Sequence, residues 1–168
     1  LPALERHLPV PAELRFERRG QSSPIKVVDE IFVAGDSGAG VQTSAFNLPN
    51  DERVRQAKGS KKVLLRNVMR AKFDVALKPI AAAVLAPGLA PDLDFDAFFD
   101  HVLFHEIAHG MGPGRLTAGG RETTVSAELR DLYPALEEAK ADTLGLWCLL
   151  HLMDEGTVPP NTARLYPT

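Results

Sequence analysis

The stretch from Phe95 to Met111 constrains the fold of this chain more than any other segment. Its apolar residues recur on nearly every side of a helix instead of along one stripe, and aspartates, which favour the positive end of the helix dipole, cluster at its start. Gly110 and the Gly112-Pro113 pair stop the pattern. We therefore expect a buried helix, whose apolar residues are Phe95, Phe98, Phe99, Val102, Phe104, Ile107, Ala108 and Met111.

Inside this expected helix lies the run His105-Glu106-Ile107-Ala108-His109, an H-E-x-x-H motif. Residues four apart share one helix face, so both imidazoles can reach the same ion while Glu106 lies to the side. Two histidines and a carboxylate form a common catalytic zinc set with a fourth position for water. The alternative is a chance pattern, but histidines and a glutamate in an apolar helix are costly without partners. The motif predicts one bound Zn²⁺, with Glu106 as general base.

A third ligand must come from elsewhere in the chain. Arg115 stands where the extended metzincin motif requires a histidine, so that class is excluded. Gluzincins take a glutamate from a later helix, and an acid one turn on can orient a ligand histidine. Glu138, followed by Asp142, is the one glutamate after His109 with an acid four positions later. We expect Glu138 as ligand and Glu137 and Asp142 as supports; a solvated first turn, or Glu137 as the ligand, are the alternatives.

The remaining pattern predicts an α+β fold that is predominantly helical. Alternating apolar residues favour a strand over 25–33, and 41–48 could return from the Gly-rich turn as a hairpin-like partner. The later elements that we expect are a helix from an N-cap at Ser60 to Pro79, a loop over 115–124, a short helix over 125–132, and a last helix from Pro134 to about Glu155. This last helix carries the glutamate ligand, and we expect the H-E-x-x-H helix to pack on it. We expect a single domain over 1–168, with a β-containing lead-in (1–50) and a helical metal-binding part (58–156).

Composition excludes several classes of function. A net charge of -3 over 168 residues supplies no cationic surface for nucleic acid, and no apolar run is long enough to cross a bilayer. We expect neither as a partner. The first residues lack a secretion signal, so we expect a cytoplasmic location, and the opening Leu1-Pro2 suggests a piece of a longer chain. Cys148 lies in an apolar stretch and is expected to be buried.

The run Glu137-Glu138-Ala139-Lys140-Ala141-Asp142 resembles the Glu-Glu-x-Arg-Ala-Glu stretch of the dipeptidyl peptidase III family of zinc exopeptidases. Together with the H-E-x-x-H helix, this resemblance implies that Glu138 is the zinc ligand and that Glu137 and Asp142 support the histidines. The segment Phe46-Asn47-Leu48-Pro49-Asn50-Asp51 is similar to the family's Asn-Ile-Pro-Asn segment. By that likeness Asn47 and Asn50 bind the substrate's peptide backbone, although an ordinary Pro-Asn turn would look the same.

The chain departs from the family in two respects. Most members carry one more residue between the two histidines, and family enzymes are several times longer, with a tyrosine and a histidine for which this chain has no counterpart. The resemblance therefore implies the zinc core of a longer metallopeptidase acting on peptides. Two alternatives remain open: a truncated zinc-stabilised module without catalysis, and a hydrolase of non-peptide amides built on the same metal core.

Overall fold

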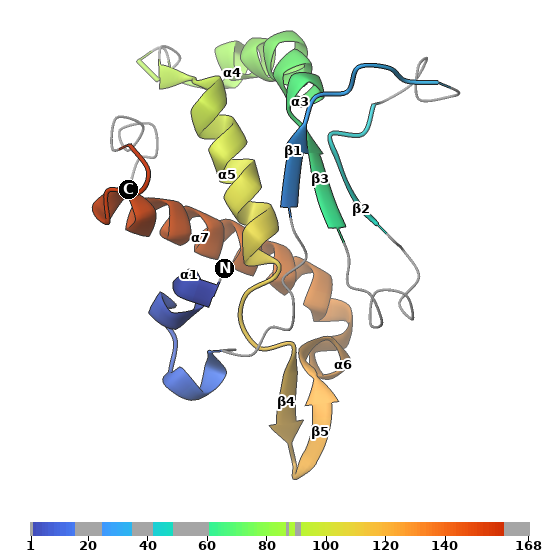
Figure 1. Ribbon diagram of the computed structural model, residues 1–168, viewed down its shortest axis with the longest axis vertical. Coiled ribbons are helices and arrows are strands. Elements are labelled where there is room, and N and C mark those ends of the chain that lie inside the picture. The colour runs from blue at the N-terminus through green and yellow to red at the C-terminus, as the bar shows by residue number, and fades with distance from the viewer. Residues whose placement is uncertain are drawn as a thin grey trace. The chain divides into compact units, whose positions relative to one another are not determined.

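The structure is a computed structural model that describes residues 2–15, 25–34, 42–48, 61–86, 88–89 and 92–159. The predominantly helical α+β class is confirmed (Figure 1). The elements, in chain order, are α1 (Pro2–His7), η1 (Ala12–Leu14), β1 (Ile25–Val28), β2 (Ala45–Leu48), β3 (Lys61–Leu65), α3 (Arg66–Lys72), the π-helical turn η3 (Phe73–Leu77), α4 (Lys78–Val84), α5 (Phe95–Ala108), β4 (Arg115–Ala118), β5 (Arg121–Thr124), α6 (Val125–Leu129), η5 (Arg130–Leu132) and α7 (Tyr133–Asp154).

The chain divides into two compact units, with the boundary inside α5. One comprises residues 1–20 and 100–160, here called the α7 unit, and the other comprises residues 21–99 and 161–168, here called the sheet unit. That 1–168 form a single domain stays a prediction. None of the helices in the described part of the chain is long and apolar enough to span a membrane.

The sheet unit holds a three-stranded sheet in the order β1-β3-β2. β3 pairs in parallel with β1 and antiparallel with β2, so β1 and β2 do not form the expected hairpin but flank a shared central strand. The strand predicted over 25–33 ends at Val28, and Ile31 and Phe32 beyond it are exposed. The strand does not continue through Ile31 and Phe32 because no apolar surface in the described structure covers their side chains.

The helix predicted from Ser60 was wrong at its start. Residues Lys61–Leu65 form strand β3, and the helix begins only at Arg66. Val63 and Leu64 fit a helical period, but pairing with strands on both sides determines their conformation and buries Leu64 completely. Ser60 itself lies outside the described residues.

Pro79 does not end the helix that begins at Arg66. α3 runs through the π-helical turn η3 into α4, and Pro79 lies in the first turn of α4, where a missing N–H is tolerated. Phe73, at the start of η3, is buried and lies 5.5 Å, ring centroid to ring centroid, from both Phe95 and Phe98. These rings form an aromatic cluster in the sheet unit, in which Phe73 and Phe95 are buried.

In the α7 unit the loop expected over 115–124 is instead a β-hairpin. β4 and β5 pair antiparallel across Gly119 and Gly120, both of which have positive φ (56° and 77°). Two consecutive residues of positive φ make the primed turn that suits the twist of a two-residue hairpin. The sequence of 115–124 is mostly polar and contains two glycines, which is more typical of a loop than of paired strands.

Helix α1 packs into the core of the α7 unit. Leu4 and Leu8 are buried, and Glu5 is only 2% exposed, with its Oε1 accepting a hydrogen bond from the Gly112 N–H at 3.1 Å. That bond satisfies a backbone donor just beyond the end of α5. Cys148 of α7 is fully buried, as predicted, with its Sγ 3.7 Å from the Met111 sulfur.

Candidate metal centre

His105 and His109 lie one turn apart at the end of α5. Their rings are nearly perpendicular (89°), and the two Nε2 atoms lie 3.1 Å apart. His105 belongs to the last turn of the assigned helix, and the hydrogen bond from the His109 N–H to the His105 carbonyl at 3.2 Å carries the helical geometry on to His109. Helical spacing thus points two imidazole nitrogens at one place, as the motif predicts.

Glu138 of α7 brings a carboxylate to the same place. Its Oε2 lies 3.3 Å from His105 Nε2, and its Oε1 lies 3.7 Å from His109 Nε2. Ligands about 2.0–2.1 Å from a tetrahedral zinc ion are roughly 3.3 Å from each other. The two histidine nitrogens, 3.1 Å apart, and the Glu138 carboxylate, 3.3 Å from one through Oε2 and 3.7 Å from the other through Oε1, are therefore spaced close to the donors of such an ion. His105, His109 and Glu138 form one group that could hold a metal ion.

Two further carboxylates hold the other ring nitrogens. His105 Nδ1 lies 2.8 Å from Asp142 Oδ1, and His109 Nδ1 lies 3.1 Å from Glu137 Oε1. An ionised carboxylate can only accept, so each Nδ1 donates its proton and each Nε2 keeps a lone pair. A carboxylate on the far nitrogen of a metal-binding histidine fixes its tautomer and its ring orientation. The arrangement therefore prepares both Nε2 atoms for a cation.

Glu137 is the less exposed member of this carboxylate pair, with a side chain 16% exposed against 63% for Asp142. Burial alone would raise its pKa, but hydrogen bonds from Lys140 and His109, together with the charge of Lys140, outweigh it and lower the pKa. Lys140 Nζ lies 2.7 Å from Glu137 Oε1 and also donates to the Met111 carbonyl at 3.1 Å. Glu137 is thus kept as the anion that His109 requires. Burial and the neighbouring Glu137 charge raise the pKa of Tyr133 one turn earlier.

Gly145 allows α7 to approach α5 closely beside the centre. A Cβ added there would lie 2.8 Å from the His105 nitrogen and 2.9 Å from the Phe104 carbonyl carbon, closer than a real Cβ comes to backbone. Only glycine therefore fits at this point of the crossing. In contrast, the side chains of Glu138 and Asp142 are each 63% exposed, so the centre is open to solvent on the α7 side.

The remaining predicted site residues are placed less directly. Glu106 is partly buried in α5 next to His105. His101, one turn earlier and not among the predicted residues, has its Nε2 3.7 Å from Asp142 Oδ1 and so lies at the edge of the carboxylate network. The backbone of Asn47 lies in β2 opposite Lys62, within the sheet unit, and Asn50 lies outside the described residues. The substrate-binding roles of Asn47 and Asn50 stay predictions.

Two contributors to the centre were not singled out from the sequence. Lys140 was noted only as a match to a motif, and its position three residues after Glu137 is the signal that could have shown their ion pair. Gly145 stands in the middle of a long helical pattern, where glycine costs about 1 kcal/mol relative to alanine. A glycine retained at such a cost indicates a close helix contact.

Comparison with known proteins shows what the chain is similar to. The structure of dipeptidyl peptidase III from Caldithrix abyssi matches 97% of the chain with a TM-score of 0.89 and 51% sequence identity. The structure of dipeptidyl-peptidase III from Corallococcus sp. strain EGB matches 98% of it with a TM-score of 0.82 and 46% identity. Both confirm the resemblance, so the chain is dipeptidyl peptidase III-like over nearly all of its length.

The chain spans only 31% of the length of each of those two proteins. A curated relative, Nudix hydrolase 3 of Arabidopsis thaliana, is 42% identical over 136 residues, which make up 80% of this chain and 18% of that protein. No family model matches the chain.

Proposed function

We propose that this dipeptidyl peptidase III-like chain is the zinc-binding core of a metallopeptidase, holding one Zn²⁺ through His105, His109 and Glu138. The observation that carries the proposal is the convergence of these three side chains, with donor atoms 3.1–3.7 Å apart. A random cluster of polar side chains would not also place a carboxylate on each outward ring nitrogen, as Asp142 and Glu137 do.

The chain's own residues have distinct parts in the proposed reaction. Asp142 and Glu137 hold the two imidazoles in the tautomer that presents Nε2, and Lys140 keeps Glu137 ionised. When bound, zinc lowers the pKa of a coordinated water molecule and polarises a carbonyl group. Glu106, adjacent to His105, accepts the proton of the attacking water and returns it to the leaving amine. The exposed side of Glu138 and Asp142 gives substrate its access.

Peptides are the substrates that we propose for this centre. Both similar structures are described as dipeptidyl peptidases, which supports cleavage of peptide bonds by a dipeptide-releasing enzyme. Asn47 and Asn50 are the proposed contacts to the peptide backbone. Because the chain spans 31% of those proteins, further groups that accelerate catalysis beyond what the metal and Glu106 supply would come from the remainder of a longer chain.

Two alternatives have support of their own. A chain that spans less than a third of its relatives could bind zinc without turnover, as a metal-stabilised module. A centre of the same kind could also cleave amides other than peptides. Because the curated relative is named a Nudix hydrolase, hydrolysis of a bond other than an amide is tested as well.

The decisive experiment compares the wild-type chain, Glu106→Gln and Glu138→Gln, each by metal analysis and by turnover of a dipeptidyl arylamide, a non-peptide amide and a nucleoside diphosphate derivative. We expect wild type and Glu106→Gln to hold zinc equally, Glu138→Gln to hold far less, and only wild type to cleave the dipeptidyl arylamide. Zinc binding without turnover would support the stabilised module instead. Cleavage that persists in Glu106→Gln would exclude the proposed base.

A further inference from the structure

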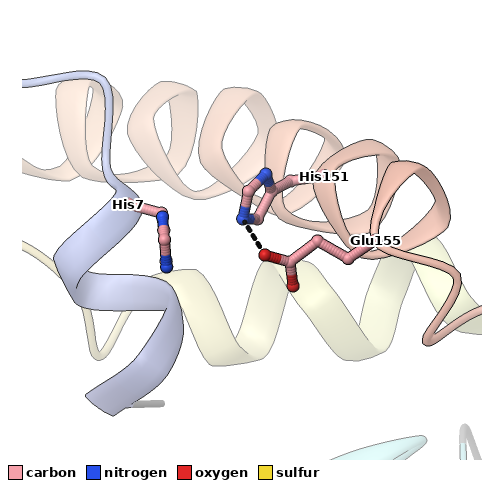
Figure 2. Close-up of side chains that lie close together, drawn as sticks. All are labelled: His7, His151 and Glu155. Carbon is pink, nitrogen blue, oxygen red and sulfur yellow. Dashed lines mark ion pairs between the residues drawn. The ribbon is translucent and has the colours of Figure 1, made fainter.

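A second cluster of metal-binding groups lies at the other end of α7. His151 and Glu155 stand one turn apart at the end of this helix, and His7 of α1 faces them (Figure 2). One ligand atom from each of the three lies within 4.8 Å of the other two. The donor set, two imidazoles and one carboxylate, is the same as that of the centre on α5.

This cluster is distinct from the first centre. His151 lies thirteen positions after Glu138, which along a helix is a distance of roughly 20 Å. At about 100° per residue, the two side chains also leave α7 in directions roughly 140° apart. His7 comes from a segment that contributes nothing to the group of His105, His109 and Glu138. One ion cannot serve both clusters.

His151 is the fixed member of the second cluster. Its ring stacks on Trp147 one turn earlier, with ring centroids 5.0 Å apart and planes 8° from parallel. The His7 ring lies 5.0 Å away on another side, tilted by 37°. Stacking of this kind holds the imidazole plane, so that its nitrogens point in set directions. Metal sites gain affinity when the ligand orientation is set before the ion binds.

The Nε2 atom of His151 gives the independent reason to expect a ligand. It is a buried polar side-chain atom that makes no hydrogen bond in the described structure, and its one neighbouring charge is Glu155 Oε1 at 3.4 Å. A buried polar atom without a hydrogen bond destabilises the folded state, and an ion that uses its lone pair would remove that cost. The carboxylate of Glu155 would at the same time balance the charge of a cation.

We propose that His7, His151 and Glu155 form a second binding site for a divalent transition-metal ion, Zn²⁺ in particular. Two nitrogen donors favour zinc over magnesium or calcium, which prefer oxygen ligands only. The ligand atoms lie within 4.8 Å of one another, and His151 Nε2 and Glu155 Oε1, 3.4 Å apart, already stand near the roughly 3.3 Å spacing of a tetrahedral zinc set. Two of its three ligands are exposed side chains, against one in the first centre, and these become ordered only on binding, so we expect the second ion to bind more weakly than the first.

Such an ion would join α1 to the end of α7. The site forms only when α1 is packed against α7, because its ligands come from positions 7 and 151–155. An ion that binds the folded chain and not the unfolded chain stabilises the fold in proportion to its occupancy. The second zinc is thus a clamp on the N-terminal helix, with no part in hydrolysis.

The test counts zinc ions on the whole chain. Metal-free protein is titrated with Zn²⁺ by calorimetry, and Co²⁺ substitution reports tetrahedral coordination by its visible absorption. The variants are His7→Gln and Glu155→Gln at the second site, Glu138→Gln at the first, and Asp154→Asn as a matched control that removes an exposed carboxylate beside Glu155 but outside the cluster. His7 is exposed, so its substitution leaves the core intact.

We expect two zinc ions per wild-type chain and per Asp154→Asn chain. His7→Gln and Glu155→Gln should lose the weaker ion and the rise in melting temperature that comes with it, and Glu138→Gln should lose the tighter ion alone. A wild-type chain that binds no ion sensitive to His7→Gln and Glu155→Gln overturns the second site, whether it binds one ion or two. Because Glu138→Gln and His7→Gln remove different ions, failure of either site is distinguishable from failure of the other.

Discussion

Gly145 of α7 lies directly against the backbone of His105 on α5. A Cβ built at Gly145 would stand 2.8 Å from the His105 nitrogen and 3.0 Å from its Cα. The contact joins the two helices that supply the proposed zinc ligands, since His105 and His109 come from the end of α5 and Glu138 from α7. The spacing between these helices therefore determines the spacing of the ligands.

Gly145→Ala should weaken both the fold and the metal centre. The new methyl group would meet rigid backbone and push the helices apart, at a cost of about 1–3 kcal/mol that outweighs the roughly 1 kcal/mol gained in helix propensity. Because ligand distances would change with the helix spacing, we expect zinc affinity to fall as well. Denaturant unfolding of the metal-free chain and zinc titration measure the two effects separately.

Gly114→Ala is the matched control for this substitution. Gly114 lies in the same unit, a Cβ added to it would have no atom within 4 Å, and it is not among the positive-φ glycines. Its substitution should change stability by less than about 0.5 kcal/mol. Equal effects of Gly145→Ala and Gly114→Ala would contradict the close-packing argument.

Asp142→Asn should reduce zinc affinity without removing a ligand. The amide can still face His105 Nδ1, but it no longer fixes the tautomer through a charge-assisted hydrogen bond, which is 2.8 Å long here. Loss of such a supporting group typically costs 10–100-fold in metal affinity or activity, about the range we expect. Competition with a chromophoric chelator measures it. Asp131→Asn, at an exposed position of η5, should leave the affinity unchanged, and an equal loss there would mean that Asp142 acts only through net charge.

The sequence predicted the convergence of His105, His109 and Glu138 better than it predicted the sheet, for a physical reason. His105, His109, Glu138 and Asp142 lie at helical spacings within two helices, so their faces follow from local periodicity. Lys61–Leu65 form a strand because they pair with β1 and β2, which are distant in the sequence. The local sequence does not show this pairing, and its apolar residues also fit a helix. The close contact at Gly145 likewise depends on which helix faces it.

Phe73→Ala should strongly destabilise the sheet unit. Phe73 is 1% exposed and contacts the rings of Phe95 and Phe98, so its truncation leaves a cavity among aromatic side chains, at a cost of about 3–5 kcal/mol. Val75→Ala, in the same π-helical turn but 79% exposed, should cost less than about 0.5 kcal/mol. Chemical denaturation of both variants provides the comparison, and similar losses would mean that the turn itself, and not its aromatic core, limits stability.

Cys148 should be inert to thiol reagents in the folded chain. Its side chain is fully buried, and that burial, followed by the nearby charge of Glu5, raises its pKa to about 11. At pH 8 only roughly one thiol in a thousand would then be ionised, and the thiolate is the reactive form. We expect labelling by iodoacetamide to be at least about a hundredfold slower in buffer than in denaturant at the same pH, and to accelerate as the pH rises towards 11.

The raised pKa of Cys148 also means that the folded state holds this proton more tightly than the unfolded state, so ionisation of the unfolded thiol lowers stability as the pH rises from 9 to about 11. A Cys148→Ala chain, which lacks that proton, should lose less stability over the same range; an identical loss, or rapid labelling at pH 8, would contradict the buried, neutral thiol.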